Sequence, residues 1–511
     1  MFTIKTALPE EKGIPSGAIR NMLEYWNKKD VPMHSLLIMR GDELVFEKYY
    51  APYKAATLHR MFSITKSLVG IGIALLTDEG KVSMDASICD YFPEYVTADT
   101  HPWIKATTIR NMLEMRTCHA ACTYKVDMTS DWVESFFTVA PTHKPGTIFH
   151  YDTSAAHVLC ALIEKVSEME FLDFMKNRLL KHVDFSEDSY MVKDPFGVSM
   201  GGSGLMATPM DVLKVLYVLS KKGTICCSDG QVRTLINPEY IGAATSNISD
   251  TIMTSPLPSE GQGYGMQIWQ NEKGGYVLFG MGGQLAISIP SYDLLVMTTA
   301  DTQGMAGGNQ IIYDGIYDVL LPGIEEDEHS SKSLNTINSV DKVSNDFNNN
   351  SNTNLKLDYK NLMEYADALV IAPPRVPESY LLKRSVSSAK SGCYSYSLSE
   401  NQHGYKKLMV SLSNDGASSI VLSTESEDRQ IVFGIDSMQE GVFKKYNTAY
   451  TAGATWLRDN VLFIKVHLIG ESVGSIRIEL YFGDDDIVLY MRKIEETYFK
   501  EFDGHFYGHV G

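Results

Sequence analysis

The sequence predicts an α+β fold: an antiparallel sheet with an inserted helical region, followed by an antiparallel β C-terminal domain that forms a barrel or a sandwich. Strand patterns at both ends of the first part of the chain support the sheet, because they enclose a long interval of helical patterns. Near the C-terminus, short alternating apolar runs follow one another with polar breaks, which is typical of small barrels and sandwiches.

The elements of the first domain follow in order along the chain. HSLLIMRGDELVFEKYY contains a Gly-Asp pair at 41–42, which predicts a β-hairpin. Residues 63–80 form an apolar helical pattern that ends at a glycine, and Thr108 and Thr208 each open a further helix as N-caps. The strand patterns GYVLFG, QLAISIP and DLLVMTTA, with a helix over 311–321, complete the domain.

A change in composition divides the chain. Residues 325–356 begin with acidic EEDEH and continue as a Ser- and Asn-rich stretch with few apolar side chains, which predicts a flexible linker. It separates a first domain, 1–324, from a β-rich domain, 357–511. The second domain begins with a helical pattern over 359–370 and continues with the strand patterns KLMVSLS, SIVLST, QIVFGI, NVLFIKVHLI, SIRIELYF and DIVLYMRKI.

The charge balance argues against two classes of partner. With 45 basic and 63 acidic side chains the formal charge is −18, so binding to nucleic acid or to an anionic membrane is not expected. The N-terminus shows no secretory apolar region, and the longest apolar run, 68–76, is far shorter than the ~20 residues that cross a bilayer. We therefore expect a cytoplasmic protein.

The cysteines point to free thiols. The seven cysteines form an odd set without CxxC pairs, as in proteins of a reducing compartment. Cys118, His119 and Cys122 lie close together in the sequence, but three candidate ligands without a second pair indicate packing rather than a metal site. No metal and no other cofactor is expected.

A serine three residues before a lysine places both side chains on one face of a helix, where a neutral amine accepts the hydroxyl proton. This spacing occurs at Ser63 and Lys66 and again at 339–342 and 387–390, but only the first pair opens an apolar helix. The amino end of that helix would stabilise an alkoxide, and burial would lower the pKa of Lys66. The alternative is a capping serine followed by a surface lysine.

Two later motifs add candidate residues. Tyr151 lies on a loop before an apolar helix and is a candidate proton carrier, although it acts as a phenolate base only if its pKa falls well below ~10. The alternative is a tyrosine that packs over the helix start. In GMGGQ, Gly280, Gly282 and Gly283 allow a substrate close to the main chain, and the N–H of Gln284 is a candidate oxyanion donor. A glycine-rich bulge between strands is the alternative.

The order SITK, YDT and GMGGQ resembles the three-motif set of the serine β-lactamases, penicillin-binding proteins and related class C-like esterases, D-amino-acid peptidases and amide-oligomer hydrolases. TIRNMLEMRT, KPGTIFHYDTSAAHVL, GGSGLMATPMDVLK and GYGMQIW resemble further stretches of that family, and the similarity covers roughly residues 10–322. It implies a β-lactamase-like domain in which Ser63 is the nucleophile, Lys66 its activating partner and Tyr151 the residue that carries a proton to the leaving group.

Two positions depart from the family's pattern. Hydrolytic relatives carry Asn at the position of Thr153 and Lys or His at the position of Met281. Without that cation a substrate carboxylate loses a charge-assisted hydrogen bond of ~1.5–3 kcal/mol, so a neutral ester or amide, of peptide or D-amino-acid type, is expected. His150 is expected to line the pocket or to pack on the loop, since with Asp152 it lacks the GxSxG elbow of a Ser-His-Asp triad.

The sequence therefore predicts a serine hydrolase for a small-molecule or peptide-like substrate, with an acyl-enzyme on Ser63. Two alternatives stay open: β-lactamase or D,D-peptidase activity, and a non-catalytic penicillin-binding-like sensor. The β-rich domain either recognises a partner, builds a homo-oligomer, or covers the active-site mouth and limits substrate size. Whether Lys66 or Tyr151 takes the first proton is not decided by the sequence.

Overall fold

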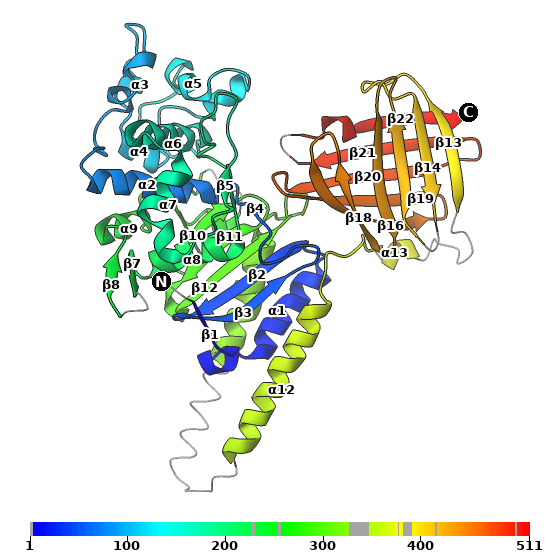
Figure 1. The fold of residues 1–511 in the computed structure, drawn as a ribbon, viewed down its shortest axis with the longest axis horizontal. Coiled ribbons are helices and arrows are strands. Elements are labelled where there is room, and N and C mark those ends of the chain that lie inside the picture. The colour runs from blue at the N-terminus through cyan, green and yellow to red at the C-terminus, as the bar shows by residue number, and fades with distance from the viewer. Residues whose placement is uncertain are drawn as a thin grey trace.

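The computed structural model describes residues 4–226, 230–253, 257–326, 347–376, 378–381, 391–413, 416–495 and 498–511. Figure 1 shows a sheet covered by helices, built mainly from the first part of the chain, and a β-barrel built from the last part. The spacings at 339–342 and 387–390, and the predicted linker from 327 to 346, lie outside the described residues.

A seven-stranded sheet forms the centre of the first domain. The predicted hairpin is present, with Ile38 paired to Phe46 and Arg40 to Glu43. All pairings are antiparallel except that of the two-residue edge strand with β3, so the predicted antiparallel sheet from both ends of the domain is confirmed. In spatial order the strands are β1 (Lys5–Thr6), β3 (Glu43–Tyr49), β2 (Met33–Arg40), β12 (Leu294–Ala300), β11 (Gln284–Ile289), β10 (Tyr276–Gly280) and β9 (Trp269–Gln270).

Both faces of this sheet are buried, which explains the uninterrupted apolar run of β2. Side chains alternate along a strand, so Leu36 and Ile38 face one layer and Leu37 and Met39 face the other. The first pair packs with α1 (Ser16–Lys28), and the second with α2 (Ile64–Asp78) and α8 (Pro209–Ser220). Each fully buried side chain of this kind contributes about 1.5–3 kcal/mol, so this three-layer packing holds the sheet and α2 in place.

The inserted region between β3 and β9 is mainly helical, as predicted. Thr108 and Thr208 are N-caps, and each side chain accepts a hydrogen bond from the main chain three residues on, at Asn111 and Asp211. Besides α2 and α8, the region contains α3 (Pro102–Lys105), α4 (Ile109–Leu113), α5 (Trp132–Thr138), α6 (Thr153–Ser167), α7 (Phe171–Arg178) and α9 (Pro238–Ala244), with short strands β4 (His59–Arg60), β5 (Tyr190–Met191), β6 (Leu205–Ala207), β7 (Thr224–Cys226) and β8 (Val232–Thr234).

The helix expected at the start of the tail packs on the first domain instead. α12 (Phe347–Ala368) begins inside the predicted linker, and Leu362, Ala366 and Leu369 join the same core as α1. Figure 1 shows α12 running alongside α1, and α10 (Gln310–Asp314), continued by a π-helical turn at Gly315–Leu320, belongs to the same layer. The spacing of these apolar side chains forms one stripe on the helix, which must be buried against a neighbour.

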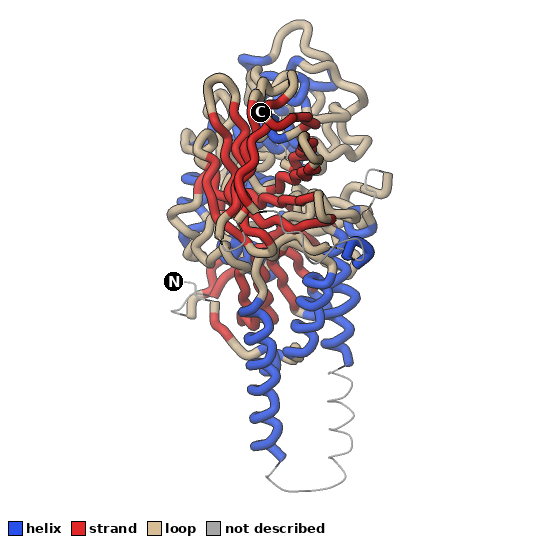
Figure 2. Tube along the Cα trace, turned by 90° about the vertical axis from the view of Figure 1, so that its right-hand side faces the viewer, coloured by secondary structure: helices blue, strands red, loops and turns tan. Residues whose placement is uncertain are grey.

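The tail forms a barrel rather than a sandwich. Its strands follow the order β16-β15-β14-β13-β22-β21-β20-β19-β18, and the parallel pairing of Gly434 with Gly453 joins β16 to β18 and closes the ring. β17 pairs with β18 on the edge opposite β19. Figure 2 shows the molecule from the side on which the barrel lies. The strands are β13 (Gly392–Leu398), β14 (Lys407–Leu412), β15 (Ser418–Ser423), β16 (Asp428–Ile435), β17 (Met438–Phe443), β18 (Thr448–Arg458), β19 (Val461–Ile469), β20 (Gly474–Phe482), β21 (Asp486–Ile494) and β22 (Gly504–Val510).

Two further observations concern the described residues only. None of their helices combines the length and apolar character that a membrane crossing requires. The cysteines among them, Cys89, Cys118, Cys122, Cys160, Cys226 and Cys393, are free thiols.

Candidate active site

The turn before α2 places Ser63 at the amino end of that helix. Ser63 is half-buried, and its side chain makes no capping bond to the helix. The preceding residue, Phe62, has a φ of 46°, in the left-handed region that costs a bulky residue about 1–3 kcal/mol. The main-chain N–H of Ser63 donates no hydrogen bond to the described residues, so it is available to a ligand atom. Strain of this kind and a free donor are common at active sites.

Lys66 lies one turn further along α2, on the same face as the serine. Its Nζ donates to Ser63 Oγ at 2.8 Å and to the carbonyl oxygen of Gly202 at 2.7 Å. Only 1% of the Lys66 side chain surface is exposed, so the amine is removed from bulk water. The alternative of a surface lysine does not hold for this side chain.

Gly202 is a site residue that the sequence did not single out. A β-carbon at this position would lie 2.3 Å from Thr153 Cγ2, so only glycine allows its main chain to approach the start of α6. That approach brings the Gly202 carbonyl to Lys66. The stretch GGSG, already noticed for its resemblance to the family, was the signal that could have identified it.

Tyr151 completes a cluster with Ser63 and Lys66. Lys66 Nζ lies over the tyrosine ring, 4.8 Å from its centroid. Burial raises the pKa of Tyr151 above its usual value, and the interaction with the Ser63 side chain opposes this rise only in part. The pKa of Tyr151 is therefore shifted away from the low value that a phenolate base requires.

The glycine-rich motif forms the turn between β10 and β11, next to the serine turn. A β-carbon on Gly280 would lie 2.5 Å from the Met61 carbonyl oxygen, so the end of β10 is in direct contact with the main chain two residues before Ser63. Gly282 and Gly283 have φ values of 81° and 97°, which favour glycine.

Gln284 begins β11 and is fully buried. Its Nε2 donates to the carbonyl of Met281 at 2.6 Å, and its Oε1 accepts from the N–H of Ala300 at 3.0 Å. The side chain therefore braces the turn, and only the main chain of Gln284 remains a candidate for substrate contact. Met281 is half-buried at the same turn.

The remaining predicted residues flank Tyr151. Thr153 is the first residue of α6, behind Gly202. His150 is half-buried; burial, followed by the neighbouring His143, lowers its pKa. The carboxylate of Asp152 accepts hydrogen bonds from Ser154 at the start of α6, so it caps this helix.

An aromatic wall that the sequence did not assign surrounds Tyr151. The ring centroid of Trp269 lies 5.4 Å from that of Tyr151, and Tyr264 lies edge-on at 6.2 Å. Phe149 contacts the far side of both neighbours. The stretch GYGMQIW, noticed only for its resemblance, contains Tyr264 and Trp269.

The barrel reaches the same region through the loop between β19 and β20. Arg60, three residues before Ser63, donates to the carbonyl of Glu471 at 3.3 Å, and Tyr190 donates to the Glu471 carboxylate at 2.8 Å. Gln303 Nε2 donates to the carbonyl of Val473 at 2.8 Å, and the same side chain packs beside Gly282. The loop is thus tethered to both the serine turn and the glycine turn.

The Beta-lactamase family model matches residues 18–319. The 6-aminohexanoate-dimer hydrolase of Paenarthrobacter ureafaciens is 22% identical over 285 residues, covering 52% of this chain and 71% of that protein. Protein flp of Staphylococcus aureus is 23% identical over 197 residues, which span 34% of this chain and only 39% of that protein.

Two solved structures are similar to the chain. The octameric penicillin-binding protein homologue from Pyrococcus abyssi has a TM-score of 0.47 at 16% identity, with 96% of this chain and 99% of that chain covered. The D-amino acid amidase from Ochrobactrum anthropi SV3 has a TM-score of 0.47 at 17% identity, with 61% and 99% covered. Because one family model spans more than half of the chain, from before the serine turn to beyond the glycine turn, the protein belongs to the Beta-lactamase family.

Proposed function

We propose that the protein is a serine hydrolase that forms an acyl-enzyme on Ser63 and hydrolyses a neutral ester or amide. The observation that supports this most directly is the 2.8 Å distance between Lys66 Nζ and Ser63 Oγ at the amino end of α2. A hydroxyl is a weak nucleophile until an adjacent base takes its proton, and this geometry supplies the base.

Acylation begins with Lys66 as a neutral amine. Burial of its side chain costs the charged ammonium more than the neutral amine, which favours the basic form before reaction. Ser63 Oγ attacks the substrate carbonyl carbon and its proton passes to Lys66 Nζ. The ammonium formed there is stabilised by the carbonyl of Gly202 and by the face of the Tyr151 ring.

Tyr151 then serves as the proton donor to the leaving group. Because its pKa is raised by burial, the phenol holds its proton at neutral pH and is not the first base. As the tetrahedral intermediate collapses, the bond from carbon to the leaving oxygen or nitrogen breaks and that atom takes the phenolic proton, which Lys66 replaces. In the second half, water attacks the acyl carbon and gives a proton to Lys66 and Tyr151. The bond from the acyl carbon to Ser63 Oγ then breaks, and the same two groups return a proton to Ser63 Oγ as the acid product leaves.

The negative charge of the tetrahedral intermediate needs preorganised donors. The N–H of Ser63 is one, since it makes no hydrogen bond to the described residues and lies at the positive end of the α2 dipole. The N–H of Gln284 is the second proposed donor, at the start of β11 beside the glycine turn. Loss of one such donor typically costs about 10²–10³ in kcat.

The side chain of Met281, at the glycine turn, favours a neutral substrate. Met281 offers no positive charge to a substrate carboxylate, and its main-chain carbonyl is already bonded to Gln284. The name of the Paenarthrobacter relative, a 6-aminohexanoate-dimer hydrolase, is consistent with an amide substrate. The loop between β19 and β20, tethered to Arg60 and Gln303, is proposed to limit the size of the group that enters.

A panel of p-nitrophenyl esters and D-amino-acid amides, with a fluorophosphonate probe read by mass spectrometry, tests the proposal. Wild-type protein should turn over members of the panel and carry the probe on Ser63, while Ser63→Ala should do neither. Ser246→Ala, which removes an exposed serine hydroxyl outside the cluster, serves as the matched control and should behave as wild type.

Two results would count against the hydrolase. Probe labelling that persists in Ser63→Ala would show that Ser63 is not the nucleophile. A single equivalent of product without turnover would favour the penicillin-binding-like sensor, and turnover of β-lactams in preference to neutral esters would favour the β-lactamase alternative.

A further inference from the structure

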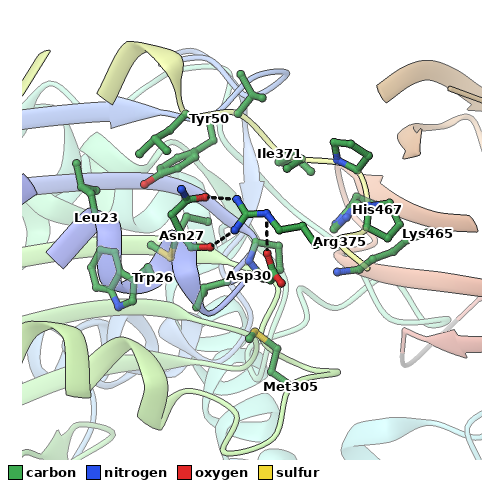
Figure 3. Close-up of a pocket in the computed structure, with 18 of the residues that line it drawn as sticks. Leu23, Trp26, Asn27, Asp30, Tyr50, Met305, Ile371, Arg375, Lys465 and His467 are labelled. Atoms are coloured by element: carbon green, nitrogen blue, oxygen red, sulfur yellow. Dashed lines mark hydrogen bonds and ion pairs between the residues drawn. The ribbon is translucent and has the colours of Figure 1, made fainter. Parts of the chain in front are cut away.

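A cavity of about 280 Å³ lies between the first domain and the barrel, and it is distinct from the Ser63 cluster. Figure 3 shows its walls, which come from α1, the segment after α12 and the outer face of the barrel. One part of the wall is apolar, with Leu23, Met33, Tyr50, Leu369 and Ile371. Ligand pockets usually have volumes of about 300–1,000 Å³, so this one suits a small molecule.

Charged side chains gather on the barrel side of the cavity. Leu462, Ile464 and Val466 point into the barrel core, so the alternate residues Lys465 and His467 face outward, into the cavity. Arg477 pairs directly with Lys465 across the β19–β20 ladder and lines the same cavity. Two cations directly opposite each other on neighbouring strands repel one another.

The nearby acidic groups do not neutralise this pair by contact. Asp30 is engaged by Arg375, whose Nε lies 3.1 Å from it, as Figure 3 shows. Asp301 is buried and receives its hydrogen bonds from Gln303. Lys465 Nζ makes no hydrogen bond or ion pair with any described residue.

Other polar atoms on this wall lack partners. His467 is 2% exposed, and its Nδ1 is buried without a hydrogen-bond partner among the described residues. The Nε of Arg477 is likewise unpartnered, while its Nη2 donates to the carbonyl of Gly304 at 2.9 Å. Burial lowers the pKa of Lys465, and Arg477 adds to this shift while Asp301 opposes it. A buried donor without an acceptor is costly, so these groups favour an anion.

We propose that the cavity binds a small organic carboxylate, with its charged end between Lys465, His467 and Arg477 and its apolar part against α1 and the segment 369–373. The anion would relieve the repulsion between Lys465 and Arg477 and accept hydrogen bonds from the donors that lack partners. The apolar wall excludes water from the same contact, which strengthens it. This site does not depend on the proposed hydrolase activity.

Isothermal titration calorimetry of the full chain with sodium hexanoate tests the proposal. Wild-type protein should bind one hexanoate per chain, and Lys465→Met should weaken binding about 10- to 100-fold, the effect of losing one charge-assisted hydrogen bond. Lys465→Arg keeps the charge and should bind within a few-fold of wild type. Lys407→Met, on the exposed face of β14, is the matched control and should change nothing.

Further titrations test the contributions of the ligand's charge and of its apolar chain, and whether binding depends on Ser63. Hexan-1-ol, which lacks the charge, and acetate, which lacks the chain, should each bind much more weakly than hexanoate. Ser63→Ala should bind hexanoate as wild type does, so failure of the hydrolase proposal leaves this result unchanged.

Three results would overturn the site: no heat of binding at millimolar hexanoate, equal affinity in a folded Lys465→Met, or acetate binding as tightly as hexanoate. Removal of one of two opposed cations should not lower the unfolding temperature, so Lys465→Met is expected to fold. Arg477→Met is the second variant, and normal binding by either folded variant would place hexanoate elsewhere.

Discussion

A β-carbon on Gly280 would lie 2.5 Å from the carbonyl oxygen of Met61, closer than any real β-carbon approaches. This contact joins the end of β10 to the turn that presents Ser63. Two segments more than 200 residues apart in the sequence are thereby held together at main-chain distance. The relative position of Ser63, the proposed nucleophile, and the glycine turn depends on the absence of a methyl group on Gly280.

Gly280→Ala should therefore separate the two turns. Overpacking of this kind costs about 1–3 kcal/mol of stability, and the displaced Gln284 N–H should lower kcat more than it changes KM. Chemical denaturation and steady-state kinetics on a p-nitrophenyl ester measure the two effects. Gly242→Ala, where a β-carbon meets nothing within 4 Å, is the control and should leave both unchanged. Normal kinetics in Gly280→Ala would show that the contact does not position the site.

Tyr151→Phe should lower kcat by about 10²–10⁴, the usual contribution of a positioned proton donor. Since the pKa of Tyr151 is raised, its phenol keeps its proton and should add no rising limb to the wild-type pH–rate profile between about pH 6 and 9. Steady-state rates across that range check both points. Tyr313→Phe removes a buried hydroxyl that has no partner among the described residues, and should be nearly silent. A wild-type limb that disappears in Tyr151→Phe would instead identify the tyrosine as the base.

Ionisation of the buried Asp152 should make the folded protein less stable as the pH rises from 3.8 to about 6. Burial raises the pKa of Asp152 from 3.8 to about 6, despite hydrogen bonds from Ser154 and Thr117. Its stabilising contribution is complete below the unfolded value and is lost as pH rises through about 6, by roughly 2–3 kcal/mol.

Asp152→Asn should flatten that part of the stability profile, measured by urea denaturation at several pH values. Asp131→Asn makes the same change at the half-buried N-cap aspartate of α5 and controls for replacing a capping carboxylate by an amide. A slope that is the same in wild type and Asp152→Asn would mean that this carboxylate does not titrate there.

Met281→Lys should create affinity for substrates that carry a carboxylate. One new charge-assisted hydrogen bond of ~1.5–3 kcal/mol corresponds to about a 10- to 100-fold lower KM for a cephalosporin such as nitrocefin. Neutral esters should be little affected, and Met281→Leu should resemble wild type. If the KM values for charged and neutral substrates fall together, the lysine acts on the turn rather than on the carboxylate.

Tyr190→Phe should loosen the loop between β19 and β20 by removing the hydrogen bond to Glu471. If the loop limits the entrance as proposed, bulky acyl esters should gain severalfold in kcat/KM relative to acetyl esters. The control is Tyr49→Phe, which removes a similar exposed bond to Glu47 on β3. Hydrogen exchange should show that the loop becomes more mobile in Tyr190→Phe. If it does and the preference for acyl size is unchanged, the loop does not select substrates by size.

Local patterns were sufficient for much of the fold and part of the site. The β2–β3 hairpin, the helix after Ser63 and the N-caps at Thr108 and Thr208 depend on neighbouring residues, so spacing and residue type predict them. The pairing of Ser63 with Lys66 is also local, because one helical turn brings them together.

Other features depend on segments that meet only in the folded chain. Gly202 reaches Lys66 because its main chain packs on Thr153, and α12 joins the first domain because its apolar stripe finds α1. The burial that raises the pKa of Tyr151 has the same origin.

The sequence by itself determined the β2–β3 hairpin, six strands of the barrel, several helices and the helical face on which a hydroxyl and an amine lie together, since these follow from periodicities of two and 3.6 residues. Tertiary structure alone decided which polar side chains lose contact with water. On β19 and β20, Lys465 and Arg477 lie on the outside of the barrel, because the alternate residues of both strands fill its core. Only the docking of the first domain against that face turns them into the charged wall of a cavity, because burial is a property of the neighbours and not of the strand.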